Sequence, residues 1–324
     1  MHCRLTVPYL LASFAFAISA PTASAQAPRP LEPIAAKLQP TRTVVYKTVG
    51  TRRLNLHIFE PTGHQPGDRR PVYMAIHGGG WTGGNARKFY PLADHFAKLG
   101  MLGISLEYRL MKPQTGTTVL DCVKDARSAV RYLRRHARDL GIDPKRIAVA
   151  GGSAGGHLAA GTALFDRCPT IDHVTANERT ADGALISCRP NLLILYYPVI
   201  DTSANGYGQQ KIGKLWQELS PVDQVTAKRP PTIIFHGTAD TVTPFSGATL
   251  FQKRMTRAGN TCQLISHKDG EHGYLIFDLK LFQQAMDRTH AFLQTHHITR
   301  PSATPTSPAN SNGTTPATVP RPAE

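Results

Sequence analysis

The stretch VAGGSAGGHLAA, residues 149–160, constrains the fold more than any other part of this 324-residue chain. Four glycines surround Ser153, although glycine inside a strand or helix costs about 0.5–1 kcal/mol relative to alanine. The apolar run before them predicts a strand and the small residues after them a helix, with a sharp, strained turn between. Only small neighbours fit such a turn. We therefore expect Ser153 to stand at a helix N-terminus, where the free N–H of Ala154 favours a developing negative charge.

Apolar runs and helical periods alternate from about residue 42 onward. The runs 42–49 and 52–61 predict an antiparallel hairpin with a turn at Gly50. The capping-box pattern of Thr118 and Asp121 and the stop signal Gly141 bound one expected helix. Further strands are expected at 71–79, 99–110, 145–153, 191–200, 230–240 and 262–267, and helices at 89–100, 120–140, 154–165, 244–259 and 279–296. This alternation predicts an α/β fold with a mostly parallel, eight-stranded sheet that carries helices on both faces.

The segment HGGGW, residues 77–81, follows the apolar run PVYMAI. Consecutive glycines let backbone N–H groups approach and point at a substrate oxygen, so this segment predicts an oxyanion hole. The favoured donors are Gly79 and Gly80, with Gly78 or Trp81 as alternatives, and Ala154 supplies the second arm. One such donor stabilises a transition state by roughly 3–4 kcal/mol.

Two polar side chains follow later strands, in loops where α/β folds place functional groups. Asp240 ends the motif HGTAD, and His272 lies in KDGEHGY after the next strand. A histidine there could take the proton from Ser153, which is a poor nucleophile at its free pKa, and an acid could orient that histidine. The chain order Ser153, Asp240, His272 fits a hydrolase triad, whereas the rival base His236 precedes the acid. We expect His77 to be structural and to hold its loop by hydrogen bonding.

The motifs HGGGW, EYRL, GGSAGG, HGTAD and EHGY together resemble the α/β-hydrolase superfamily, in its HGGG-type esterase and lipase branch related to hormone-sensitive lipase. The resemblance covers residues 44–292. It implies an α/β-hydrolase fold, with Ser153 as nucleophile, Asp240 as orienting acid and His272 as base. Arg109 of EYRL is expected to be structural and to pair with Asp125.

Two departures from hormone-sensitive-lipase-like enzymes point to a different group. Gly152 stands where those enzymes carry the aspartate of GDSAGG, and too few residues lie between Ala25 and the first strand for an N-terminal cap. Both features are similar to bacterial esterases of the feruloyl and acetyl-xylan esterase-like group, which implies little or no cap domain. By analogy, an open site accepts small acyl groups on bulky alcohols such as sugars. We expect Trp81 and Tyr274 to contact the substrate.

The sequence thus predicts a serine carboxylester hydrolase that acts on short-chain acyl or aryl esters, including esters of carbohydrates, through an acyl-enzyme on Ser153. No metal or organic cofactor is expected. An arylformamidase or peptidase-like amide hydrolase would use the same triad, and a non-catalytic glycan-binding protein could use the same fold. A long-chain lipase would need an apolar lid, for which the polar stretch 201–218 is too short and mixed.

The two ends of the chain differ in composition from the domain between them. Residues 1–25 combine a basic start, an apolar run and a small-residue pattern ending at Ala25, which predicts a cleaved signal peptide and a secreted or periplasmic protein. No stable membrane insertion is expected, because a spanning helix usually needs about 20 apolar residues. Residues 26–298 are predicted to form the catalytic domain, and residues 299–324, rich in Pro, Ser and Thr, a disordered tail.

The formal net charge of +15 comes from scattered basic residues. No basic stripe is interleaved with aromatic side chains, so we expect a solvated basic surface and no nucleic-acid partner.

Export would place the four cysteines after residue 25 in an oxidising compartment. Cys168 and Cys188 bracket a polar segment and are the favoured disulfide pair, with four buried thiols as the alternative.

Overall fold

The computed structural model describes residues 29–166, 168, 171 and 175–299. Their strands form one eight-stranded sheet in the order β1-β2-β4-β3-β5-β6-β7-β8, which confirms the predicted α/β fold. The strands are β1 (Arg42–Val49), β2 (Arg52–Phe59), β3 (Arg70–Ile76), β4 (Leu102–Leu106), β5 (Ile142–Gly152), β6 (Leu192–Tyr196), β7 (Thr232–Gly237) and β8 (Cys262–His267). The predicted signal peptide, and all of the predicted tail except residue 299, lie outside the described residues.

The β1–β2 hairpin predicted around Gly50 is confirmed, and β2 also pairs antiparallel with β4. All other neighbouring strands are parallel. Because parallel strands point the same way, the loops that follow β3, β5, β7 and β8 meet at one edge of the sheet. Segments far apart in the sequence are therefore brought together there.

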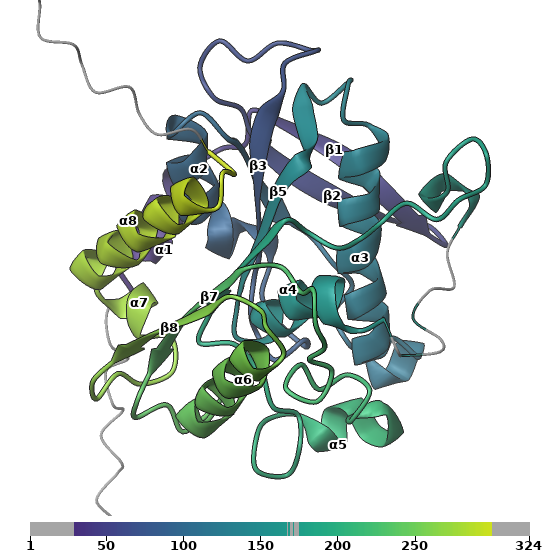
Figure 1. The fold of residues 1–324 in the computed structure, drawn as a ribbon. Coiled ribbons are helices and arrows are strands. Elements are labelled where there is room, and N and C mark those ends of the chain that lie inside the picture. The colour runs from purple at the N-terminus through teal and green to yellow at the C-terminus, as the bar shows by residue number, and fades with distance from the viewer. Residues whose placement is uncertain (1–28, 167, 169–170, 172–174, 300–324) are drawn as a thin grey trace, which may run out of the picture.

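Helices cover both faces of this sheet (Figure 1). They are α1 (Leu31–Lys37), α2 (Tyr90–Lys98), α3 (Val119–Arg135), α4 (Ala154–Leu164), α5 (Gln209–Ile212), α6 (Phe245–Arg257), α7 (Tyr274–Phe277) and α8 (Leu279–Thr295), and the 3₁₀ segment η1 (Ala86–Phe89) precedes α2. Side chains of α3, α4 and α6 pack in one buried cluster on one face, and side chains of α2, α7 and α8 pack in a second cluster on the other.

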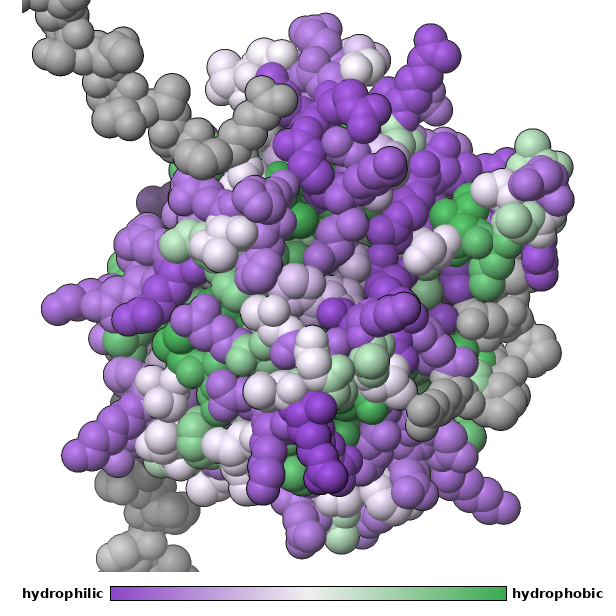
Figure 2. Space-filling model, in the orientation of Figure 1, coloured by the Kyte–Doolittle hydropathy of each residue, from purple (hydrophilic) through white to green (hydrophobic). Residues whose placement is uncertain are grey.

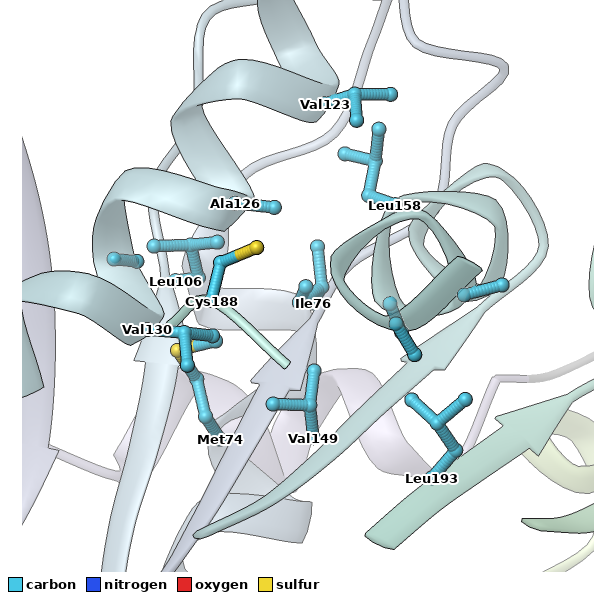
Figure 3. Close-up of a cluster of buried hydrophobic side chains, with 14 of the residues drawn as sticks. Met74, Ile76, Leu106, Val123, Ala126, Val130, Val149, Leu158, Cys188 and Leu193 are labelled. Atoms are coloured by element: carbon cyan, nitrogen blue, oxygen red, sulfur yellow. The ribbon is translucent and has the colours of Figure 1, made fainter. Parts of the chain in front are cut away.

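Figure 3 shows part of the first cluster, where apolar side chains of α3 and α4 meet those of the central strands. These side chains are fully buried, and burial of apolar surface contributes about 25 cal/mol per Å². Among the labelled residues are Val123, Ala126 and Val130 of α3, Leu158 of α4, and Met74, Ile76, Leu106, Val149 and Leu193 of the sheet. The continuous apolar runs that predicted the strands are explained by this burial on both faces.

Helix α3 begins as predicted but ends earlier. The capping box at Thr118 and Asp121 is present, so the predicted start is confirmed. The helix stops at Arg135, five residues before the predicted end at 140, because the chain already turns there toward β5. The turn is closed by hydrogen bonds from the N–H of Gly141 to Arg138 and from the N–H of Ile142 to the carbonyl of residue 137.

Arg109, which follows β4, is anchored to α3 by the predicted pair with Asp125. Its Nε and Nη2 donate to the two carboxylate oxygens of Asp125 at 2.8 and 2.9 Å, which confirms that prediction. Lys47 of β1 adds a third cationic contact, with its Nζ 2.9 Å from Oδ1 of Asp125. The Asp125 side chain is fully buried, so these partners compensate the charge that burial removes from water.

Cys168 and Cys188 are both buried in the first cluster, and a bridge between them stays a prediction. Burial raises the pKa of the Cys122 thiol and of the Cys262 thiol to about 12. Neither of these two thiols is therefore a nucleophile near neutral pH.

Hydrophilic residues cover most of the molecular face drawn in Figure 2, and hydrophobic residues appear between them in small groups. Among the described residues, no helix combines the length and apolar character that crossing a membrane requires.

Candidate active site

Ser153 occupies the turn between β5 and α4, in a backbone conformation that few residues other than glycine adopt. Its φ is +54° and its ψ is −123°. The turn brings backbones into close contact: a Cβ atom on Gly155 would lie 2.0 Å from the carbonyl oxygen of Ile76, at the end of β3. Glycine at position 155 therefore allows α4 to start directly against β3, with Ser153 at the first turn of the helix.

Three side chains from different strand ends form one hydrogen-bonded chain. Oγ of Ser153 lies 2.9 Å from Nε2 of His272, and Nδ1 of the same ring lies 2.8 Å from Oδ2 of Asp240. These residues follow β5, β8 and β7, respectively. The geometry can carry a proton from the serine hydroxyl to the imidazole, whose other nitrogen donates to a carboxylate.

Asp240 is held as an anion by the loop after β7. Its carboxylate accepts hydrogen bonds from the N–H groups of Val242 and Thr243 at 2.9 and 2.8 Å, and from Oγ1 of Thr243 at 2.9 Å. Burial raises the pKa of Asp240, but hydrogen bonds from His236, His272 and Thr243 outweigh that effect and hold the pKa well below its usual range. The carboxylate therefore stays charged at neutral pH and can stabilise a cationic imidazolium.

The structure brings His272, and not its rival His236, to the serine. The His236 ring is fully buried behind Asp240, and its Nε2 donates to the carbonyl of Thr243 at 2.7 Å. His77 holds its loop through a bond from Nδ1 to the carbonyl of Gly78 at 2.8 Å, as predicted. Burial lowers the pKa of His77 to about 4, so this ring is neutral at physiological pH.

The glycine loop after β3 passes directly beside the serine. A Cβ atom on Gly78 would lie 3.0 Å from Cβ of Ser153. The N–H groups of Gly79, Gly80 and Ala154 donate no hydrogen bond to any protein group in the described part of the chain. They are therefore available to a ligand oxygen at the pocket, which Gly78, Gly79, Gly80 and Ser153 all line.

The pocket beside Ser153 has a volume of about 520 Å³, within the usual range for small-molecule sites. Its inner wall is apolar and includes Leu92, Tyr196, Leu275 and Met286, which belong to the second buried cluster. Helix α1, which the sequence analysis did not anticipate, also lines it through residues such as Leu31 and Ala35. A short helix before β1 thus contributes to the site although no cap domain is present in the described residues.

The structure does not bring the two predicted substrate contacts into this pocket. The indole of Trp81 is fully buried and packs against His157 and Tyr207, with ring centroids 5.1 and 5.7 Å apart. The φ of +64° at Trp81 turns its side chain into the core beneath the loop. Tyr274 is nine-tenths buried and stacks on His267. The prediction that Trp81 and Tyr274 contact the substrate is therefore wrong, because neither side chain lines the pocket.

Three residues of the site were not predicted from the sequence. Thr243 lies 3.1 Å from Nδ1 of His272, and its Asp-x-x-Thr spacing after Asp240 was a local signal. Tyr197 packs edge-on against the His272 ring at 5.2 Å, and Phe89 lines the pocket. Tyr197 and Phe89 carry no local pattern, because their role depends on packing between β6, η1 and the turn at Ser153.

The packing around Gly152 explains why this chain lacks the aspartate of the GDSAGG motif. A Cβ atom at this position would lie 2.8 Å from Cζ of Phe89 and 3.1 Å from the hydroxyl of Tyr197. The two aromatic rings fill the space that an aspartate side chain needs. Among the described residues, no group of three or more His, Cys, Asp or Glu side chains could hold a metal ion.

Comparisons with known proteins support an esterase relationship. The family model BD-FAE matches residues 56–255. Esterase LipQ of Mycobacterium tuberculosis is 28% identical over 71% of this chain and 56% of its own length, and carboxylesterase NlhH of the same species is 29% identical over 65% and 69%. The chain spans about half the length of LipQ and only 43% of the related mycobacterial LipM.

Solved structures agree with this relationship over nearly their full length. Thermogutta terrifontis esterase 2, in the form phosphorylated by paraoxon, superposes with a TM-score of 0.71 at 36% sequence identity. The match covers 80% of this chain and 95% of that chain. With the fold, the serine turn and these matches together, the chain belongs to the BD-FAE family of α/β-hydrolase esterases.

Proposed function

We propose that the protein is a serine carboxylester hydrolase that forms an acyl-enzyme on Ser153. The observation that carries the proposal is the hydrogen-bonded chain from Ser153 through His272 to Asp240 beside a pocket of about 520 Å³. The esterases among its relatives support the same reaction class.

The proposed reaction begins when Nε2 of His272 accepts the proton of the Ser153 hydroxyl and Oγ attacks the ester carbonyl carbon. The carbonyl π electrons move onto oxygen, and the N–H groups of Gly79, Gly80 and Ala154 stabilise the resulting oxyanion. Collapse re-forms the carbonyl and breaks the bond to the alkoxy oxygen, which takes the proton from His272.

Water completes the cycle by the same route. His272 accepts a proton from water, the hydroxide oxygen attacks the acyl carbon, and collapse of the second intermediate expels Oγ of Ser153 with return of that proton. Asp240 holds the imidazole with Nδ1–H toward itself and stabilises the imidazolium in both halves of the reaction.

We propose short-chain acyl or aryl esters as substrates, including esters of carbohydrates. Thermogutta terrifontis esterase 2 has been solved with propionate and with butyrate bound, which supports a short acyl group for this chain as well. The exposed mouth leaves room for a bulky alcohol, whereas the inner wall is apolar.

The test is hydrolysis of p-nitrophenyl acetate, butyrate and decanoate by the wild-type protein, by Ser153→Ala and by Ser246→Ala, which removes an exposed hydroxyl on α6. We expect rates that fall with chain length and at least a roughly 10³-fold loss in Ser153→Ala alone. A decanoate optimum would replace the short-chain proposal with a lipase. Folded protein that cleaves no ester would contradict the proposal, and amide substrates would then test the amide-hydrolase alternative.

A covalent label separates the nucleophile from general loss of activity. Thermogutta terrifontis esterase 2 is phosphorylated by paraoxon, so we expect one diethylphosphoryl group on the peptide that carries Ser153. Mass spectrometry of the digested protein locates the label. Labelling of Ser153→Ala at an equal rate would place the nucleophile elsewhere.

We further propose that the protein is exported and cleaved after Ala25. The sequence of residues 1–25 carries this proposal. N-terminal sequencing of protein recovered from the culture medium or periplasm is expected to begin at Gln26. Full-length protein confined to the cytoplasm would contradict it.

A further inference from the structure

The mouth of the pocket carries cationic side chains that have no acidic partner. Arg87 and Lys88 of η1 line the pocket, are exposed, and form no ion pair within the described part of the chain. Glu32 is the single carboxylate among the described lining residues, and Arg29, which also lines the mouth, already pairs with it at 3.3 Å. The mouth is therefore positively charged where a substrate enters.

Another cation, Lys211, lies beside the Gly80 end of the glycine loop. A Cβ atom on Gly80 would lie 3.1 Å from Nζ of Lys211 and 2.7 Å from the hydroxyl of Tyr207, which lines the pocket. At the other end of the loop, burial lowers the pKa of the His77 imidazole, and the positive charge of Lys88 lowers it further. The loop that supplies the oxyanion donors is thus flanked by Lys88 and Lys211.

Tyr207 is oriented by this arrangement as a hydrogen-bond donor. Nζ of Lys211 donates to the Tyr207 hydroxyl oxygen at 2.7 Å. An ammonium cannot accept, so the phenolic O–H remains free to donate to a ligand in the pocket. A phenol that accepts from a cation donates most favourably to an anion.

We propose that Tyr207, Lys211, Lys88 and Arg87 form an anion subsite that selects esters whose alcohol portion carries a carboxylate. The substrate class is an acylated hydroxy acid, such as an O-acyl hydroxybenzoate or an acylated uronic acid residue. This inference rests on the proposed ester hydrolysis at Ser153. We place the carboxylate on the alcohol side because the buried apolar lining suits an uncharged acyl group, while Arg87 and Lys88 are exposed lining residues and Lys211 reaches the pocket through Tyr207.

The test compares 4-acetoxybenzoate with its neutral methyl ester, methyl 4-acetoxybenzoate. The quantity measured is the ratio of their kcat/KM values, and comparing this ratio between variants cancels the intrinsic reactivity of the two phenyl esters. Lys88→Gln/Lys211→Gln removes two cations, and Tyr207→Phe removes the hydroxyl together with the bond that it accepts from Lys211. Lys253→Gln removes an exposed lysine on α6 that does not line the pocket.

We expect the double variant to lower the ratio about fivefold, as the loss of two partly exposed ion pairs implies. Tyr207→Phe should lower it as well, and Lys253→Gln should keep the wild-type value. The wild-type ratio should also fall as salt rises from about 10 mM to about 150 mM, because the Debye length shortens from about 30 to about 8 Å. A ratio that neither the variants nor salt changes would overturn the subsite.

Two further outcomes separate the subsite from the ester hydrolysis itself. The acyl-side anion p-nitrophenyl hydrogen succinate, compared with the butyrate ester, should respond less to the double variant, and a larger response would overturn the alcohol-side assignment. If folded protein cleaves neither ester, the proposed hydrolysis fails. Binding of 4-acetoxybenzoate to that protein, compared with binding to its Lys88→Gln/Lys211→Gln variant, then decides the subsite alone.

Discussion

Oδ2 of Asp240 lies 2.8 Å from Nδ1 of His272, in a pair whose members are separated by 32 positions in the sequence. The same oxygen accepts from Oγ1 of Thr243 at 2.9 Å and lies 3.3 Å from Nε2 of His236. Because a carboxylate offers only lone pairs, His272 must carry its proton on Nδ1. Nε2 is then bare and faces Ser153, which is the tautomer that a general base requires.

Replacing Asp240 by asparagine should therefore disable the base while leaving the fold nearly intact. An amide can present its NH₂ to Nδ1 and favour the wrong tautomer, and in a serine protease the equivalent change lowers kcat about 10⁴-fold. We expect a loss of about 10³- to 10⁴-fold in kcat for p-nitrophenyl acetate. Circular dichroism must show folded protein, and a loss below tenfold would mean that Asp240 does not orient His272.

Gly152→Ala should destabilise the protein without removing any polar group. The new Cβ would lie 2.8 Å from Cζ of Phe89, inside normal contact distance, so we expect a cost of about 1–3 kcal/mol in urea denaturation. Phe89→Leu should recover part of that cost in the double variant.

Gly83→Ala is the matched control for this measurement. A Cβ atom at Gly83 would lie at an ordinary 3.8 Å from the carbonyl oxygen of Gly79. An unchanged urea midpoint in Gly152→Ala would show that the side chains of Phe89 and Tyr197 move aside with no loss of unfolding free energy.

The fold could be predicted from sequence to the level of strand and helix order. The central strands and one face of α3 are buried, and burial requires apolar residues at the buried positions of each segment. These positions can therefore be recognised from the local sequence of each segment. The end of α3 could not be predicted in the same way. Ala137 and Leu140 continue the apolar period, but hydrogen bonds from Arg70 and Ile142 draw the chain out of the helix toward β5.

In the candidate site too, some residues could be predicted from the sequence and others could not. Ser153, Asp240 and His272 follow strand ends that the sequence marks, so topology alone predicts that they converge. Trp81 was misplaced because the left-handed backbone at this position, which turns the indole inward, is a property of the folded loop. The roles of Phe89, Tyr197 and α1 arise from packing across the sheet edge, for which one sequence carries no periodic signal.

The pair of Arg109 and Asp125 should be strongly coupled in stability. Arg109→Met leaves a fully buried carboxylate with Lys47 as its remaining cation, and breaking such a pair costs about 3–5 kcal/mol. Arg109→Met/Asp125→Leu removes both charges, so we expect it to cost clearly less than the sum of the two single changes. Urea denaturation of all four proteins gives the coupling, and additive effects would show that the pair contributes little.

Buried His157 should make the protein lose stability as the solution becomes mildly acidic. Burial lowers the pKa of His157 to about 4 and outweighs the opposite effect of the hydrogen bond that its Nε2–H donates to the carbonyl of Leu219. Nδ1 has no partner among the described residues, so no group there stabilises an added proton. The unfolded chain binds a proton near pH 6.5, so this contribution is complete above that pH and is lost as pH falls toward the folded value. The total is about 3 kcal/mol, at about 1.4 kcal/mol per pH unit.

The measurement that isolates His157 is the slope of unfolding free energy against pH between about 6.5 and 4. His77, whose pKa burial also lowers to about 4, contributes a second proton over the same window. His157→Gln should remove one proton from the slope, whatever its effect on stability at neutral pH. A variant with the wild-type slope would contradict the assignment, because the proton taken up on unfolding would then belong to other groups.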